Sequence, residues 1–256
     1  MPIKNREIDL SIVIPAYNEE KRIGATLLSI DKYLERQKYT YEILVVSDGS
    51  TDKTVDVVRK YKQLVKNLEV IDNLENEGKG AVVRQGLLEA KGKYRVFTDA
   101  DSSTSIDHVK KMWPLFEKGY HIVIGTRDSR DDKDATQAVK QPLYRRIIGD
   151  AGNLLIQLIA VPGIWDTQCG FKGFTAKAVK DIFPRLRINR WGFDIEILAI
   201  AKRLGYKIGI IPVHWENDPQ SHVTFMGYLN TFRELFVVKW SLIRDTYGIK
   251  KTTKER

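Results

Sequence analysis

The chain has 256 residues, of which 43% are hydrophobic and 29% are charged, a composition typical of a folded globular protein rather than a disordered one. A single cysteine, Cys169, excludes an internal disulfide framework, and the absence of any apolar run of about 18 residues excludes an ordinary transmembrane helix. The formal net charge of +9 favours an anionic partner, such as nucleic acid, a phosphorylated substrate or an anionic membrane surface.

Short β-branched runs bounded by turn residues predict five strands in the first half of the chain. They cover residues 11–15, 41–47, 68–72, 94–98 and 122–125. Helices are predicted between them, one with Asn18 as its N-cap, one from about residue 52 and one over residues 81–90. Alternating strands and helices imply right-handed crossovers, so we predict an α/β protein with a mostly parallel sheet covered by helices on both faces.

The second half is less regular. It predicts, in order, a polar loop over 128–141, a helix over 143–160, an extended segment over 166–175, a helix over 193–204, a strand over 207–212 and an amphipathic helix over 225–247.

Ligands of parallel sheets bind outside the carboxyl ends of the strands. This rule places residues 15–19, 47–50, 99–101 and 125–127 along one edge of the predicted sheet. The chemistry of the protein is therefore expected at that edge.

Asp99 and Asp101 directly follow the fourth predicted strand. Two carboxylates one residue apart on a turn can face one oxygen-seeking cation, and Mg²⁺ or Mn²⁺ often takes one or two protein carboxylates and completes its shell with phosphate and water. The alternative is a strand-end turn with solvated aspartates, but the neighbouring edge segments favour the metal.

Two further segments of this edge have both a ligand-binding and a local interpretation. Asp48 could accept a hydrogen bond from a nucleotide base, or serve only in a turn before a helix. Lys79 lies between Gly78 and Gly80, where it could meet an anion, but the segment fits neither the phosphate-loop nor the dinucleotide-binding pattern.

Arginines and acids of the second half are the remaining candidates. Arg127, Arg145 and Arg146 could bind phosphate through guanidinium forks, or lie at the surface in ion pairs. Asp194 and Glu196 follow Trp191 among apolar residues, a setting that would raise the pKa of a general base. The alternative, favoured by the local sequence alone, is that the aromatic residues belong to the core and Asp194 caps the following helix.

Eight segments together resemble the family-two glycosyltransferases with the GT-A fold. They appear in the family's order between Ser11 and Trp215, and they are SIVIPAYNEE, VVSDGSTD, NEGKGAVVRQG, FTDADSS, GTR, DTQCGFK, RWGFDIE and IIPVHW. Within this group the chain is most similar to the dolichyl-phosphate β-glucosyltransferases and related polyprenyl-phosphate sugar transferases. The resemblance implies a single GT-A domain over 1–256, with a nucleotide-sugar half (1–127), an acceptor half (128–223) and a C-terminal amphipathic helix with a basic tail (224–256).

The resemblance also implies roles for individual residues. Asp99 and Asp101 would form the DxD motif and bind Mg²⁺ or Mn²⁺. The catalytic set would be Asp101, Asp194 and Arg127. The residues around the nucleotide sugar would be Pro15, Tyr17, Glu19, Asp48, Lys79, Asp99 and Asp101, with Asp48 at the uracil. The acceptor phosphate would meet Arg127, one of Arg145 and Arg146, and His222, which replaces the family's lysine.

The implied activity is inverting transfer of a hexose, glucose from UDP-glucose, to a dolichyl or polyprenyl phosphate. Relatives carry two aspartates where this chain has Ser47 and Asp48, and mannosyl-transferring relatives carry glutamine where it has Ser103. The alternatives are GDP-mannose-dependent transfer to dolichyl phosphate, a same-fold enzyme with a soluble hydroxyl acceptor, and a basic nucleic-acid-binding module. The sequence has no zinc-finger, helix-turn-helix or RNP-like pattern, which argues against the last alternative. Nucleic acid is therefore not expected as a partner.

A lipid acceptor implies contact with a membrane surface. Apolar residues of the segment 225–247 recur mainly at helical spacing among Arg233, Lys239 and Arg244, which fits an interfacial helix. Packing against the protein's own sheet or a second subunit is the alternative. Since the first residues also lack the apolar core of a secretory signal, we expect a cytoplasmic protein that binds peripherally to the cytoplasmic face of a membrane.

Overall fold

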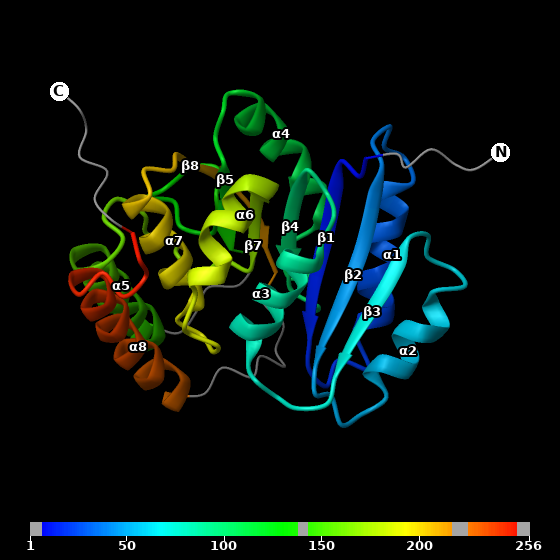
Figure 1. The fold of residues 1–256 in the computed structure, drawn as a ribbon, viewed down its shortest axis with the longest axis horizontal. Coiled ribbons are helices and arrows are strands. Elements are labelled where there is room, and N and C mark those ends of the chain that lie inside the picture. The colour runs from blue at the N-terminus through cyan, green and yellow to red at the C-terminus, as the bar shows by residue number, and fades with distance from the viewer. Residues whose placement is uncertain (1–6, 138–142, 217–224, 250–256) are drawn as a thin grey trace.

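A computed structural model describes residues 7–137, 143–216 and 225–249. Its centre is a seven-stranded sheet in the order β3-β2-β1-β4-β7-β5-β8 (Figure 1). The strands are β1 (Leu10–Ala16), β2 (Tyr41–Asp48), β3 (Leu68–Asn73), β4 (Tyr94–Thr98), β5 (Ile122–Thr126), β7 (Phe171–Thr175) and β8 (Ile208–Pro212). All neighbours pair in parallel except β7, which lies antiparallel between β4 and β5.

Helices cover both faces of this sheet (Figure 1). They are α1 (Ile23–Leu34), α2 (Thr54–Tyr61), α3 (Lys79–Glu89), α4 (Val109–Glu117), α5 (Leu143–Ile159), α6 (Ala176–Ile182), α7 (Phe193–Arg203) and α8 (Phe225–Ile243). Short 3₁₀ turns span Ile106–His108 and Phe183–Arg185, and a second, two-stranded sheet pairs β6 (Thr136–Gln137) with β9 (His214–Trp215).

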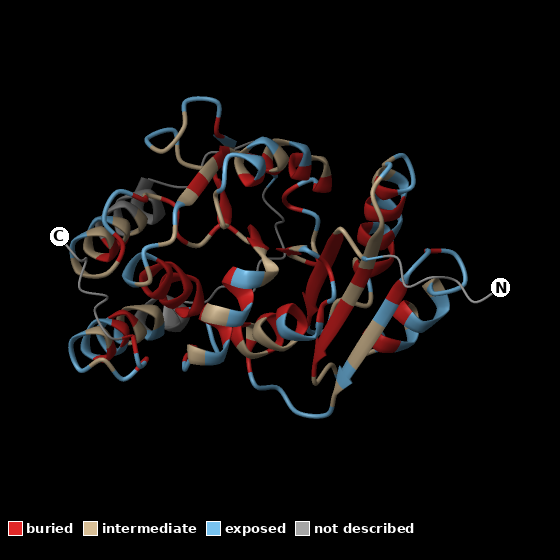
Figure 2. Cartoon of the chain, turned by 45° about the horizontal axis from the view of Figure 1, so that its top comes forward, coloured by how far each residue is buried: buried red, intermediate tan, exposed pale blue. Residues whose placement is uncertain are grey.

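The alternation of side chains along the strands divides the core into two layers. On β1, Ile12 and Ile14 face α1, α2 and α4, whereas Val13 faces α3 and the layer that includes α6 and α7. Figure 2 shows the central strands and the inner sides of these helices as buried, whereas the edge strand β3 is mostly intermediate or exposed. Near-continuous burial on both faces explains why β1, β4 and β5 read as apolar runs.

The predicted α/β class and mostly parallel sheet are confirmed, and the five predicted strands of the first half match β1 to β5 to within one or two residues. The prediction of Asn18 as a helix N-cap is wrong. α1 begins at Ile23 after Arg22, and Asn18 has a φ of +55° while its side-chain oxygen accepts a hydrogen bond from the Thr51 amide at 2.9 Å. Asn18 therefore braces one loop of the sheet edge against another.

The predicted loop over 128–141 is also partly wrong, because it contains strand β6. The pairing of β6 with β9 joins this segment to the stretch that follows β8. Residues 138–142 lie outside the described part of the chain.

Candidate active site

One edge of the sheet gathers the chemically distinctive side chains. The parallel strands β1, β2, β4 and β5 end there, and because β7 runs the other way, its first residues lie at the same edge. The amino ends of α3 and α7 supply Lys79 and Asp194, whose charges influence one another. The structure thus brings segments nearly 180 residues apart in the sequence, beginning with residue 15 and ending with residue 194, to one edge.

The turn after β4 presents Asp99 and Asp101. Ser102 adopts a φ of +57°, and the turn is fixed from α1, where the Thr26 hydroxyl donates to the Ala100 carbonyl at 2.6 Å and accepts from the Ser102 hydroxyl at 2.9 Å. One oxygen of Asp101 accepts a hydrogen bond from the Ser103 amide at 2.9 Å. The turn therefore holds two carboxylates at the edge, and their oxygens are ligands that hard metal ions prefer.

These two carboxylates fit a divalent cation that takes its remaining ligands from a substrate and from water. No group of three or more histidine, cysteine or acidic side chains that could hold a metal occurs among the described residues. A two-carboxylate site suits Mg²⁺ or Mn²⁺ with phosphate and water as the other ligands. This position favours a cation, because the ammonium of Lys79 already lies against Asp99.

Lys79 contacts the first of these carboxylates. Its Nζ lies 2.5 Å from Oδ1 of Asp99, and 5.7 Å from the centre of the Trp191 ring. Burial alone would lower the pKa of Lys79, but the carboxylates of Asp99 and Asp194 raise it above its ordinary value. Lys79 is therefore a firmly charged ammonium at the predicted nucleotide-binding edge.

Gly170 explains how Asp99 fits beside β7. A Cβ atom at residue 170 would lie 1.9 Å from Oδ2 of Asp99, so any larger residue would displace the carboxylate. Cys169, the preceding residue, is fully buried, and burial raises its pKa to about 12. A buried thiol with a raised pKa stays protonated near neutral pH, which makes Cys169 a poor nucleophile.

Asp48, predicted at the uracil, holds the loop before α3. Its carboxylate accepts hydrogen bonds from the amides of Glu77 at 2.8 Å and Gly78 at 3.0 Å, and from the side-chain amide of Asn76 at 3.0 Å. Gly78 has a φ of +108°, and a Cβ there would lie 2.5 Å from the carbonyl oxygen of Asn189. Asp48 therefore fixes the backbone from which Lys79 extends.

The end of β1 and the loop that follows it contribute three of the residues predicted near the nucleotide. Pro15 lies in β1 itself, and Tyr17 follows it with 45% of its surface exposed. Glu19 forms an ion pair with Arg22 at 2.7 Å. Of the predicted nucleotide neighbours in this loop, only Tyr17 presents a large exposed side chain.

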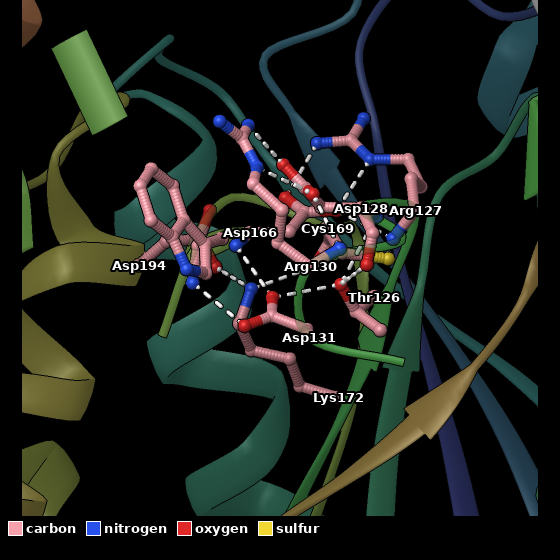
Figure 3. A network of polar contacts seen from close by, with 10 residues as sticks. Thr126, Arg127, Asp128, Arg130, Asp131, Asp166, Cys169, Lys172 and Asp194 are labelled. Carbon is pink, nitrogen blue, oxygen red and sulfur yellow. Dashed lines mark hydrogen bonds and ion pairs between the residues drawn. The ribbon is translucent and has the colours of Figure 1, made fainter. Parts of the chain in front are cut away.

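A polar network holds Arg127 at the end of β5 (Figure 3). Its Nε and Nη2 each donate to Asp166 at 2.8 Å, a bidentate pair. Asp131 accepts in turn from the Asp166 amide at 2.8 Å, the Thr126 hydroxyl at 2.9 Å and the Trp165 amide at 2.9 Å. Burial alone would raise the pKa of Asp166, but Arg127 lowers it below its ordinary value. Arg127 is therefore a fixed, oriented cation rather than a mobile surface arginine.

A second buried pair lies next to this network (Figure 3). Lys172, on β7, is fully buried, and its Nζ donates to Oδ1 of Asp194 and to the Cys169 carbonyl, both at 2.6 Å. Burial raises the pKa of Asp194, although Lys172 and Lys79 act in the opposite direction. Asp194 is thus a buried carboxylate whose charge is balanced by lysine.

Glu196, the other predicted candidate for a general base, has its oxygens occupied by hydrogen bonds within the protein. It is fully buried, and its oxygens accept from the amides of Arg187 and Ile188 at 3.1 and 3.0 Å and from the Tyr247 hydroxyl at 2.8 Å. Glu234 of α8 similarly accepts from the Gly192 amide at 2.6 Å. These two acids anchor the segment that carries Trp191 and Asp194.

The structure describes less of the other residues that were predicted to bind the acceptor phosphate. Arg145 and Arg146 lie in the first turns of α5, and their side chains are not described. His222 lies outside the described residues.

Sequence reasoning assigned no role to Asp131, Asp166, Gly170 or Lys172. Three of them, Asp166, Gly170 and Lys172, lie in DTQCGFK, one of the eight segments that resemble the family, and this resemblance is the sequence signal for them. Asp131 lay in a charged loop with no distinguishing pattern.

The family model described as glycosyl transferase family 2 matches residues 11–183. The dolichyl-phosphate β-glucosyltransferase of Dictyostelium discoideum is 34% identical over 97% of the chain and 79% of its own length. The enzyme of the same name from Homo sapiens is 34% identical over 96% of the chain and 79% of its own length.

Solved structures show the same fold at lower identity. Mannosyl-3-phosphoglycerate synthase from Rubrobacter xylanophilus has a TM-score of 0.70 at 17% identity, covering 97% of this chain and 77% of that one. Glucosyl-3-phosphoglycerate synthase from Mycobacterium tuberculosis, in complex with Mn²⁺, UDP and glucosyl-3-phosphoglycerate, has a TM-score of 0.63 at 18% identity, covering 96% and 82%. The expected GT-A architecture is confirmed.

Proposed function

This chain belongs to glycosyl transferase family 2, and from that premise we propose that it transfers glucose from UDP-glucose to a dolichyl-type polyprenyl phosphate, with inversion at the anomeric carbon. Relatives named dolichyl-phosphate β-glucosyltransferase, 34–37% identical over 87–97% of the chain, support this choice of sugar and acceptor. The observation that carries the proposal is the meeting of Asp99, Asp101, Lys79 and Asp194 at one sheet edge.

The donor half of the site suits a nucleoside diphosphate sugar. Asp99 and Asp101 would hold Mg²⁺ or Mn²⁺, which supplies Lewis-acid neutralisation of the departing diphosphate when it is bound. Lys79 adds a positive charge at the same edge, on a backbone that Asp48 fixes. Tyr17 extends from the neighbouring loop toward solvent, where a nucleotide base could stack.

The acceptor half suits an anion that needs positioning rather than deprotonation. A phosphate monoester already carries about 1.5 to 2 negative charges at pH 7, so it can attack without a general base. Arg127 would meet this phosphate, because Asp166 fixes the orientation of its guanidinium at the end of β5. Arg145 or Arg146 and His222 remain proposed as its partners.

A hydroxyl acceptor would instead require a base, and Asp194 is the buried carboxylate at the right edge. Incubation with UDP-glucose and Mn²⁺ should therefore yield glucosylated lipid from dolichyl phosphate and none from dolichol. GDP-mannose should give no product. Mass spectrometry of the extracted lipid measures both, and glucose on dolichol, mannose on dolichyl phosphate, or no product at all would refute the proposal.

We also propose that α5 and α8 bind the membrane that contains the lipid acceptor. The two helices pack together at one end of the molecule (Figure 1), where Phe232 of α8 lies against Gly152 of α5. Large apolar side chains are exposed on both helices, and they are Leu154, Leu158, Phe236, Val237, Trp240 and Ile243. The guanidinium of Arg244 lies 4.3 Å from the centre of the Trp240 ring. No helix in the described residues is long and apolar enough to cross a bilayer, so these groups suit peripheral contact.

Replacement of Trp240 by glutamate should reduce binding to vesicles of phosphatidylcholine and phosphatidylserine by about tenfold, because it removes an apolar anchor and adds a charge that anionic lipid repels. Cosedimentation measures the bound fraction. The matched control is Leu64→Glu, a change at a side chain that is 68% exposed and lies just beyond α2. Equal loss in both variants, or no effect of Trp240→Glu, would contradict this membrane contact.

A further inference from the structure

We propose that Lys79 is an exchangeable counter-ion, which holds Asp99 in the ligand-free protein and passes to the diphosphate of the donor when a divalent cation takes Asp99. Lys79 would then couple nucleotide binding to metal binding. The inference rests on the proposed function, because it requires both ligands at this edge. It extends the predicted position of Lys79 near the nucleotide to a defined exchange of partners.

The ammonium already occupies a cation position. Its Nζ lies 2.5 Å from Oδ1 of Asp99, and the carboxylates of Asp101 and Asp194 also act on its charge. A divalent cation that uses this oxygen of Asp99 must therefore displace the ammonium. The two ions compete directly for one carboxylate.

The two lysines of the site differ in their freedom to move. Lys172 is fully buried and donates both to Asp194 and to the Cys169 carbonyl. The side chain of Lys79 is 22% exposed, and that of Asp99 is 33% exposed. Lys79 is consequently the lysine that can change partners.

The backbone of Lys79 is fixed while its side chain is long. Asp48 binds the Gly78 amide, and Gly78 has no room for a side chain against Asn189. The four-carbon stem can therefore swing its ammonium over a distance of a few ångströms without any change in the fold. A diphosphate beside Asp101 would give it a new anionic partner.

Competition and exchange together predict positive coupling. Bound diphosphate would draw Lys79 away and leave Asp99 to the metal, and bound metal would release Lys79 to the diphosphate. Coupling between two ligands is reciprocal, so each should raise the affinity of the other. Direct contact between the metal and the phosphate also contributes to this coupling. A mutation of Lys79 removes only the part of the coupling that the lysine supplies.

Lys79→Met should therefore tighten binding of Mn²⁺ alone by about tenfold, weaken binding of UDP alone, and reduce the factor by which UDP enhances Mn²⁺ affinity. Electron paramagnetic resonance of free Mn²⁺, measured with and without UDP, reports these affinities without any turnover. Lys79→Arg, which keeps the charge, should retain weak binding of Mn²⁺ alone. Lys60→Met, at an exposed position of α2, controls for the change in net charge.

Two results would overturn the inference in distinguishable ways. If the unmodified chain binds Mn²⁺ and UDP, but Lys79→Met leaves the affinity for Mn²⁺ alone unchanged or lower, Lys79 does not compete with the metal and the inference fails by itself. If the unmodified chain binds neither ligand, singly or together, the proposed function fails and the inference falls with it.

Discussion

Asp101→Asn should lower the rate of glucose transfer by about 10²- to 10³-fold at saturating UDP-glucose, with little change in the free energy of unfolding. The reason is that Asp101 lies on a fixed turn, where one oxygen accepts only a local amide hydrogen bond from Ser103 that asparagine can also accept through its side-chain oxygen. The substitution removes a negative charge from the proposed cation site without removing a packing contact. Initial rates with dolichyl phosphate, together with Mn²⁺ titration, measure the effect.

The matched control is Asp56→Asn, which removes an exposed carboxylate of α2 that lies 3.8 Å from Arg59. This control should leave transfer unchanged. If Asp101→Asn retains more than about a tenth of the rate, or if its loss is equalled by Asp56→Asn, Asp101 does not contribute to the chemistry in the way proposed.

Local sequence signals are sufficient to predict a strand where residues close together in the sequence determine it. β1 and β4 are short apolar runs between turn residues, and their parallel register places the segments after them at one edge. These signals are sufficient to place Asp99 and Asp101, which follow β4, at that edge. They cannot place β7, because antiparallel insertion between β4 and β5 depends on pairing with residues about 50 to 80 positions away.

The same limit applies to the partners of individual side chains. A sequence shows that Asp48 ends a strand, but whether its oxygens are filled depends on the amides of the loop before α3. Likewise, the pairing of Arg127 with Asp166 spans 39 positions. Residue type indicated phosphate binding for this arginine, whereas its orientation is a property of tertiary structure.

Lys172 is the extreme case, because lysine is rarely buried without a partner and composition alone predicts it at the surface. It is fully buried beside Phe97, 5.5 Å from the centre of that ring, because Asp194 from α7 balances its charge. Lys172→Met keeps the length and apolar stem of the side chain and leaves Asp194 without this partner. The free energy of unfolding at pH 8 should fall by about 3 to 5 kcal/mol.

The pH dependence of this loss identifies its cause. Burial already raises the pKa of Asp194, and Lys172 is among the groups that oppose the rise, so its removal should raise that pKa further. At a pH between the ordinary carboxyl pKa of about 4 and the raised pKa of Asp194, this carboxyl holds a proton in the folded variant that it has released in the unfolded chain. Stability then falls as pH rises, so the deficit of Lys172→Met should be smaller at pH 5 than at pH 8.

The double variant Lys172→Met/Asp194→Asn separates the buried charge from the lost packing. Because it replaces the ion pair with two neutral side chains of similar size, it should recover much of the stability and lose the added pH dependence in urea denaturation. Lys177→Met is the surface control, since Lys177 pairs with Asp181 at 2.9 Å on side chains that are 69% and 41% exposed, and its loss should be much smaller. A double variant as unstable as Lys172→Met, with no difference between pH 5 and pH 8, would mean that Lys172 stabilises the protein through packing and its bond to the Cys169 carbonyl rather than by balancing Asp194.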